Sequence, residues 1–256
     1  MPFRSPYADV EIPQGSVFDY LFADMTPTLI AQVALVDGAS GDETSYGALV
    51  AQIERFAGAL AARGVRVGDV VALHSPNVPA FATAFHGILR AGATATTNNA
   101  LYTAGEIEKQ LRDSAAVMLV TVSPLLPQAA AAAKAAGIDR VIVMDGAEGY
   151  ESLRDLLMEN APAPAVSFDP ATHIAVLPYS SGTTGIPKGV VLTHRNLVAN
   201  VAQSLGQLSL DDGDRVMAVL PFFHIYGMTV LLNLALRARA ALVTMPRFDL
   251  PEFLRV

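Results

Sequence analysis

One segment of the sequence concentrates the residue types that bind phosphate groups. Residues 179–189 read Tyr-Ser-Ser-Gly-Thr-Thr-Gly-Ile-Pro-Lys-Gly, after an apolar run and before a stretch with helical periodicity. Backbone N–H groups at glycines, hydroxyl groups and one ammonium group can together surround a polyphosphate. We therefore predict a polyphosphate-binding loop made of Ser180, Ser181, Gly182, Thr183, Thr184, Gly185 and Lys188.

The segment differs from both common nucleotide-binding motifs. A Walker A loop needs a second glycine five residues after the first, followed by lysine and serine or threonine. Counted from Gly182, that position holds Pro187, and the dinucleotide pattern G-x-G-x-x-G is absent. The alternative is a flexible surface loop rich in serine, threonine and glycine. The preceding strand and the lysine favour phosphate binding.

The elements around this loop alternate between strands and helices. Apolar, β-branched runs predict strands at 70–74, 94–97, 117–122, 141–144, 174–179, 216–220 and 241–244. Helical periodicity and caps predict helices at 79–90, 103–114, 124–136, 152–159, 195–205 and 225–237. This alternation predicts an α/β fold with parallel β-sheets flanked by helices. The Pro- and Ala-rich residues 162–170 predict a connecting loop.

The phosphate segment resembles the AMP-binding motif of the adenylate-forming superfamily, and the likeness continues through Thr193 and His194. This superfamily includes acyl-CoA synthetases, luciferases and the adenylation domains of peptide synthetases. Residues 221–227, Pro-Phe-Phe-His-Ile-Tyr-Gly, resemble its next motif. Shorter segments resemble the 4-coumarate–CoA ligase branch, namely 75–77, 90–93, 102–110 and 245–249. The resemblance runs from about Thr44 to the end of the chain.

The resemblance implies a two-step reaction that uses ATP, Mg²⁺ and CoA. A carboxylate attacks the α-phosphate of ATP and releases pyrophosphate, which leaves an acyl-adenylate. The thiol of CoA then displaces AMP and gives a thioester. Both steps move negative charge, so fixed donors and Mg²⁺ should dominate catalysis.

The resemblance also implies residue roles. The loop residues would contact the ATP phosphates, with Lys188 catalytic. His224 would lie beside the carboxylate and the α-phosphate, as a catalytic and substrate-binding residue. The acyl pocket would be lined by Tyr226, Gly227 and Val230.

Two further sites are implied less directly. Arg247 aligns with a basic residue, usually lysine, that contacts CoA. No His, Asp or Glu cluster has metal-ligand spacing. We therefore expect no protein-only metal site, and Mg²⁺ would arrive with ATP, with Thr184 as a candidate ligand.

Aryl acids such as 4-coumarate or cinnamate are the leading substrates, and fatty acids are the alternative. A second alternative is a non-catalytic nucleotide-binding fragment. An adenylation domain for amino acids is disfavoured, because residues 221–228 lack the expected aspartate.

Composition excludes several other classes. Of 256 residues, 52% are hydrophobic and 16% are charged, which excludes a disordered chain. The net charge of −7 gives no electrostatic case for nucleic-acid binding. The chain has no cysteine, no long apolar segment and no leader-like N-terminus. These features predict a cytoplasmic protein without a membrane span.

The sequence predicts two subdomains and an incomplete chain. Residues 1–170 would form a first α/β subdomain, and 171–256 a second, incomplete one that contains the phosphate loop. A helix capped by Asp249, with Pro251 in its first turn, is cut at Val256. The small C-terminal domain of the family would be absent. We therefore expect the chain alone to be inactive or very weak, and its cut edge to be covered, with a homodimer as one arrangement.

Overall fold

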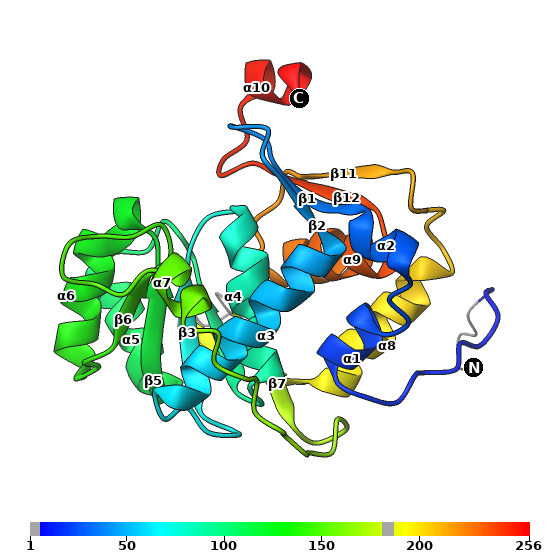
Figure 1. The fold of residues 1–256 in the computed structure, drawn as a ribbon. Coiled ribbons are helices and arrows are strands. Elements are labelled where there is room, and N and C mark those ends of the chain that lie inside the picture. The colour runs from blue at the N-terminus through cyan, green and yellow to red at the C-terminus, as the bar shows by residue number, and fades with distance from the viewer. Residues whose placement is uncertain (1–5, 181–186) are drawn as a thin grey trace.

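The computed structural model describes residues 6–180 and 187–256. It confirms an α/β fold of parallel sheets flanked by helices (Figure 1). Six strands form one sheet in the order β10-β7-β4-β3-β5-β6, and four form another in the order β11-β12-β1-β2. A separate two-stranded ribbon joins β8 (Tyr179–Ser180) to β9 (Lys188–Gly189).

The six-stranded sheet is parallel except at one edge. Its parallel strands are β3 (Val70–His74), β4 (Thr94–Asn98), β5 (Ala116–Thr121), β6 (Val141–Val143) and β7 (Ile174–Val176). The short strand β10 (Leu192–Thr193) pairs with β7 in the antiparallel direction. The carboxyl ends of its parallel strands therefore meet at one edge, where ligands bind in open α/β sheets.

The four-stranded sheet combines the beginning and the end of the chain. Its strands are β1 (Val33–Asp37), β2 (Glu43–Ser45), β11 (Arg215–Ala218) and β12 (Ala241–Thr244). Strand β1 pairs in parallel with β12, with Leu35 opposite Leu242, and in the antiparallel direction with β2. Each large sheet takes strands from both sides of residue 170. A boundary at residue 170 would therefore separate strands that belong to the same sheet.

Two long helices lie in the main hydrophobic core, and two more cover the opposite face of the six-stranded sheet. Helices α3 (Tyr46–Ala62) and α4 (Pro79–Arg90) share this core with side chains from both sheets. Helices α5 (Ala104–Asp113) and α6 (Leu126–Ala136) pack against a second, smaller cluster that includes Ala72 and Leu119. Because successive side chains of a strand point to opposite faces, β3 contributes Leu73 to one core and Ala72 to the other.

The remaining helical segments have between three and twelve residues. Around the four-stranded sheet and the site lie α1 (Val17–Phe22), α2 (Pro27–Ala31), α8 (His194–Leu205), the π-helical segment η2 (Gly227–Asn233) and α9 (Leu234–Ala238). The others are η1 (Ser123–Leu125), α7 (Leu153–Met158) and α10 (Leu250–Arg255). Helix α10 projects away from the body of the molecule (Figure 1).

Several predicted elements are confirmed to the residue. Strands β3 and β12 and helix α4 have the predicted bounds. The predicted capping box is present, because Thr103 Oγ1 accepts the N–H of Glu106 and the Glu106 carboxylate accepts the N–H of Thr103. Gly137, at φ +76°, ends α6 in a left-handed conformation.

The prediction of one strand over 174–179 is wrong in its extent. The run is divided into β7 and β8 (Tyr179–Ser180), with Pro178 between them. Proline has no N–H to donate to the sheet, so it interrupts the ladder. The predicted helix over 225–237 is helical from Ile225, and its middle forms the π-helical segment η2.

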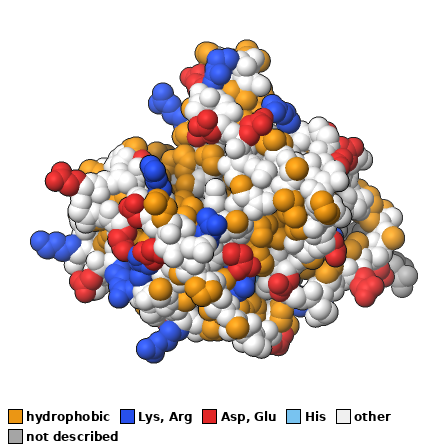
Figure 2. All heavy atoms as spheres, viewed as in Figure 1, with side chains coloured by type: hydrophobic (Ala, Val, Ile, Leu, Met, Phe, Trp, Pro, Cys, Tyr) orange, Lys and Arg blue, Asp and Glu red, His pale blue; other side chains and the backbone are white. Residues whose placement is uncertain are grey.

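The surface shows no single-signed face in the view of Figure 2. Acidic and basic side chains are scattered over it singly or in small mixed groups, with apolar side chains between them. In the described part of the chain, no helix combines the length and apolar character needed to cross a membrane.

Candidate functional site

The two ends of the predicted phosphate loop lie side by side. Strand β8 pairs with β9 (Lys188–Gly189) in an antiparallel ribbon, and Ser180 lies directly opposite Lys188. Both side chains are exposed. The ribbon therefore presents one hydroxyl and one ammonium group at the base of the loop. Five predicted contacts lie outside the described residues: Ser181, Gly182, Thr183, Thr184 and Gly185.

The base of this ribbon is fixed to β4 and α5. Thr96 Oγ1 donates to the Leu177 carbonyl at 2.9 Å, and Leu177 N–H donates to the Ala95 carbonyl at 2.8 Å. The Tyr179 hydroxyl donates to Asp113 Oδ2 at 2.5 Å. Burial, together with the Asp113 carboxylate, raises the pKa of Tyr179 well above its ordinary value. The phenol therefore stays protonated and keeps its donor role.

His224 lies in a tight turn between β11 and η2. Its N–H donates to the Pro221 carbonyl at 3.1 Å, which closes the turn. The N–H of Tyr226 donates to His224 Nδ1 at 3.4 Å. A neutral ring that accepts at Nδ1 carries its proton on Nε2. The exposed imidazole can therefore donate a hydrogen bond to a carboxylate or phosphate oxygen.

Two side chains at the carboxyl edge of the six-stranded sheet hold this turn. Asn77, in the loop after β3, accepts from Phe222 N–H at 2.8 Å and donates to the carbonyls of Ala218 and Leu220 at 2.9 and 2.8 Å. Thr97 Oγ1 donates to the Phe223 carbonyl at 2.8 Å. Neither residue was assigned a role by the sequence reasoning. Their positions in the sequence give a signal, since Asn77 follows β3 and Thr97 lies near the carboxyl end of β4. Polar residues at the carboxyl ends of neighbouring parallel strands approach the same edge of the sheet.

Two of the three predicted acyl-pocket residues line one groove. Tyr226 and Val230, one helical turn apart, face α8 across a groove of about 310 Å³. Tyr226 is 51% exposed. The residues facing them carry no charge: Asn200, Gln203 and Ser204 of α8, and Gln207 and Leu208 just after it.

Gly227, the third predicted acyl-pocket residue, does not line this groove. It is buried, and a Cβ atom there would lie 2.1 Å from the Pro221 carbonyl oxygen. Real Cβ atoms do not approach an oxygen so closely, so any side chain at this position must push η2 away from the His224 turn. Glycine is therefore needed for the packing of these two backbones.

We expect Gly227→Ala to lower the free energy of unfolding by about 1–3 kcal/mol, because overpacking forces the backbone to shift. Gly105→Ala is the matched control, since nothing lies within 4 Å of a Cβ at that exposed position of α5. Alanine there should stabilise the helix by roughly 0.5–1 kcal/mol. Urea unfolding of both variants measures this. A Gly227→Ala variant as stable as the parent would contradict the close approach.

Arg247 lies apart from this groove. It is exposed in the segment after β12 and lines a cleft of about 360 Å³ together with Gly38, Asp249 and Glu252. The structure thus brings Ser180 and Lys188 together, and Tyr226 and Val230 together. It places Arg247 at a separate cleft.

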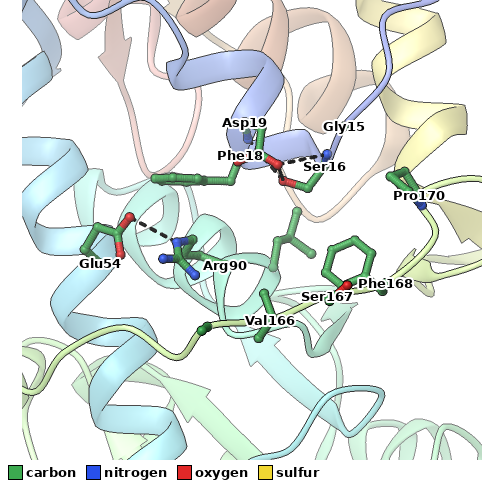
Figure 3. A pocket seen from close by; sticks show the side chains of 12 residues that line it. Gly15, Ser16, Phe18, Asp19, Glu54, Arg90, Val166, Ser167, Phe168 and Pro170 are labelled. Carbon is green, nitrogen blue, oxygen red and sulfur yellow. Dashed lines mark hydrogen bonds and ion pairs between the residues drawn. The ribbon is translucent and has the colours of Figure 1, made fainter.

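A further cleft, of about 480 Å³, involves none of the predicted site residues that the structure describes. Phe18 and Phe168 lie on two of its sides (Figure 3). The arginine of this cleft already has partners within the protein: Arg90 Nε donates to Glu54 at 3.0 Å, and Nη1 donates to the Pro164 carbonyl at 2.9 Å. We assign it no role in the site.

Three other histidines, His74, His86 and His194, are fully buried. His194 Nδ1 accepts the N–H of Val17 at 3.1 Å, and its ring stacks on Phe168 with centroids 4.7 Å apart. His86 Nδ1 donates to the Ala82 carbonyl, and its Nε2 lies 3.0 Å from the Asn233 amide. His74 is fully buried at the end of β3. These contacts give the rings packing roles.

Among residues 6–180 and 187–256, no group of three His, Asp or Glu side chains is arranged to hold a metal ion.

Comparison with known proteins extends over nearly the whole chain. The family described as "AMP-binding enzyme" matches residues 23–256. The 4-coumarate–CoA ligase 5 of Oryza sativa subsp. japonica is 40% identical over 99% of this chain and 48% of its own length. The 4-coumarate–CoA ligase 4 of Arabidopsis thaliana is 35% identical over 97% of this chain and 46% of its own length. The chain spans about half the length of the curated relatives it matches.

Solved structures agree with this. A long-chain-fatty-acid–CoA ligase (FadD1) from Archaeoglobus fulgidus superposes with a TM-score of 0.88 over 98% of this chain and 51% of its own, at 26% identity. Apo MatB from Rhodopseudomonas palustris superposes with a TM-score of 0.82 over 95% of this chain and 47% of its own, at 29% identity.

Proposed function

Because this chain belongs to the AMP-binding enzyme family, we propose that the whole protein is an ATP-dependent carboxylate–CoA ligase of the 4-coumarate or cinnamate type. The observation that carries the proposal is the 40% identity to a 4-coumarate–CoA ligase over 99% of the chain, which includes the phosphate segment and the His224 turn. The substrates are an aryl carboxylic acid, ATP and CoA.

The chemistry proceeds in two steps. A carboxylate oxygen of the acid attacks the α-phosphate of ATP, the bond to the β-phosphate oxygen breaks, and pyrophosphate leaves. The sulfur of CoA then attacks the carbonyl carbon of the acyl-adenylate, AMP leaves, and the thiol proton passes to solvent. Both steps develop negative charge on oxygen, so fixed donors and cations accelerate them.

Three groups of this chain fit those needs. Lys188, with Ser180 opposite it, would bind the phosphates at the base of the ribbon. The Nε2–H of His224 would donate to the carboxylate or to the α-phosphate oxygen. The acid would extend into the groove of Tyr226 and Val230, whose uncharged lining suits an aryl or acyl chain.

Two further roles are proposed on sequence resemblance. Arg247 would contact a phosphate of CoA, and Mg²⁺ would be held mainly through the ATP phosphates, where it neutralises charge. Gly227 supports the acyl pocket indirectly in this proposal, because it sets the distance between η2 and the His224 turn. A cytoplasmic location and a homodimer stay predictions.

The likeness to a long-chain-fatty-acid–CoA ligase, at a TM-score of 0.88, favours fatty acids as the second candidate substrate class. The groove between η2 and α8 is open and uncharged, which is compatible with both classes.

The deciding experiment measures ATP-dependent thioester formation with CoA and a panel of aryl and fatty acids. The 256-residue chain is compared with the protein extended to the full length of its relatives. We expect thioester only from the longer protein, with 4-coumarate or cinnamate preferred. Preference for long-chain acids would select the alternative. Nucleotide binding without pyrophosphate release in either protein would replace the ligase proposal with a binding role.

A further inference from the structure

Strand β4 holds both halves of the proposed site through two adjacent threonines. Thr96 and Thr97 point to opposite faces of the sheet, as successive strand residues do. We call the β8–β9 pair, which contains Ser180 and Lys188, the phosphate ribbon. Thr96 donates to the Leu177 carbonyl, just before this ribbon, and Thr97 donates to the Phe223 carbonyl, just before His224. The distance between ribbon and turn is therefore set by one rigid strand.

Asn77 provides the second attachment of the turn. Its side chain is 4% exposed, and its amide makes three hydrogen bonds of 2.8–2.9 Å to the backbone of residues 218–222. That backbone leaves β11 of the four-stranded sheet, whereas Asn77 follows β3 of the six-stranded sheet. The Asn77 side chain thus holds the backbone that leaves the four-stranded sheet against the carboxyl edge of the six-stranded sheet.

The His224 turn depends on these attachments for its position. Phe222 is fully buried against Phe81, with ring centroids 5.4 Å apart, and anchors the turn in the core. His224 itself is exposed; its N–H donates to Pro221, its carbonyl accepts from Met228 N–H of η2, and its ring accepts from Tyr226 N–H. No other group in the described residues hydrogen-bonds its ring, so the backbone of the turn determines where the imidazole lies.

We propose that Asn77 and Thr97 are positioning residues that set the orientation of His224 relative to the phosphate ribbon. The inference rests on the proposed function, which places His224 at the carboxylate and the α-phosphate. Removing the Thr97 hydroxyl leaves the Phe223 carbonyl without its partner, and a carbonyl shielded from water is costly. The turn relieves that cost by moving toward solvent and takes His224 with it. A displacement of about 1 Å can lower a rate by roughly 100-fold.

The test uses the full-length protein and compares matched threonine variants. Thr97→Val keeps the side-chain shape and removes the hydroxyl, and Thr97→Ser restores the hydroxyl. Thr94→Val is the control, because Thr94 lies on the same strand, is equally buried and donates to the Ile174 carbonyl at the same 2.8 Å distance. Asn77→Asp keeps the acceptor for Phe222 N–H and removes both donors.

We measure kcat and KM of acid-dependent ATP–pyrophosphate exchange together with the Tm of each variant. Thr97→Val and Asn77→Asp should lower kcat by about 10- to 100-fold with little change in the KM for ATP. Thr97→Ser should recover most of the rate, and Thr94→Val should lower Tm as much as Thr97→Val with kcat within about twofold of the parent. Equal losses of kcat in Thr94→Val and Thr97→Val would overturn the proposal.

A second readout separates this inference from the proposed function. The ring nitrogen resonances of His224 are followed in protein labelled with ¹⁵N-histidine, and a His224→Gln variant identifies them. If the parent shows no ATP–pyrophosphate exchange with any acid, the ligase proposal fails. The His224 resonances then test the positioning inference on their own. A shift in Thr97→Val but not in Thr94→Val supports positioning by Thr97, and unmoved resonances in both overturn it.

Discussion

Lys188→Met in the full-length protein should lower the rate of adenylate formation by about 100- to 1,000-fold. Lys188 lies opposite Ser180 at the base of the phosphate ribbon and is exposed. Its ammonium group would face charge that develops as pyrophosphate leaves, and removing one such fixed donor typically costs this much rate. Methionine keeps most of the length and the apolar stem and removes only the charge.

The effect should be confined to catalysis. An exposed residue with no ion pair among the described residues contributes little to stability, so the free energy of unfolding should stay within about 0.5 kcal/mol of the parent. Lys134→Met is the matched control, since Lys134 is exposed in the last turn of α6, away from the site. Pyrophosphate exchange gives the rates and urea unfolding the stabilities. Exchange by Lys188→Met within tenfold of the parent would remove Lys188 from the proposed machinery.

Acidification should unfold the protein because three buried histidines resist protonation. Burial lowers the pKa of His194 to about 3 and of His74 to about 4, and it also lowers the pKa of His86. All three lie below the ordinary value near 6.5, so the unfolded chain binds more protons between these limits. Their contribution is fully present above about pH 6.5 and is lost as the pH falls toward 4.

The size of this loss is large compared with typical protein stability. Each such histidine costs about 1.4 kcal/mol per pH unit below 6.5, or roughly 4 kcal/mol at pH 5 for His74 and His194 together. His86 acts in the same direction. Domains of this kind are commonly stable by about 5–15 kcal/mol. We therefore expect the urea midpoint to fall steeply between pH 6.5 and 5.

His194→Asn identifies one part of that slope. The asparagine oxygen can accept the Val17 N–H in place of Nδ1 and does not titrate. The variant should lose about 1.4 kcal/mol per pH unit less than the parent over the same range. A free energy of unfolding that is flat from pH 7 to pH 5 would contradict buried, neutral histidines in the fold.

Local patterns predicted the elements around the site well. Strand β3 and helix α4 have the predicted bounds because a compact apolar run and a first-turn proline mark them. Helix α3 was not predicted, although it has a signal: Ser45 caps it, and Leu49, Ile53, Phe56 and Leu60 follow at helical spacing. Strand β2 has only three residues, Glu-Thr-Ser, and shows no apolar alternation to read.

The sequence marks the candidate site by its residue types and does not mark the residues that support it. The phosphate segment and the His224 turn stand out because glycine, hydroxyl, lysine and aromatic residues are concentrated in them. Asn77 and Thr97 bind backbone atoms 126 to 145 residues away. A hydrogen bond to a carbonyl leaves no mark on the identity of the partner residue, so the sequence shows only that Asn77 and Thr97 lie near strand ends and not which carbonyls they bind. The same holds for Gly227, whose glycine is required by the backbone of Pro221.

The pairing of β1 with β12 has a consequence for synthesis on the ribosome. Leu35 and Leu242 become neighbours only after the ribosome has made the more than 200 residues between them. At about 5–20 residues per second, the hairpin of β1 and β2 waits roughly 10–40 s for its parallel partner. Throughout that interval the inner edge of β1 offers unpaired backbone groups beside the apolar side chains of Leu35 and Val36, which is the usual starting point for aggregation. Nascent chains of this protein should therefore bind chaperones through residues 33–37 until β12 has emerged.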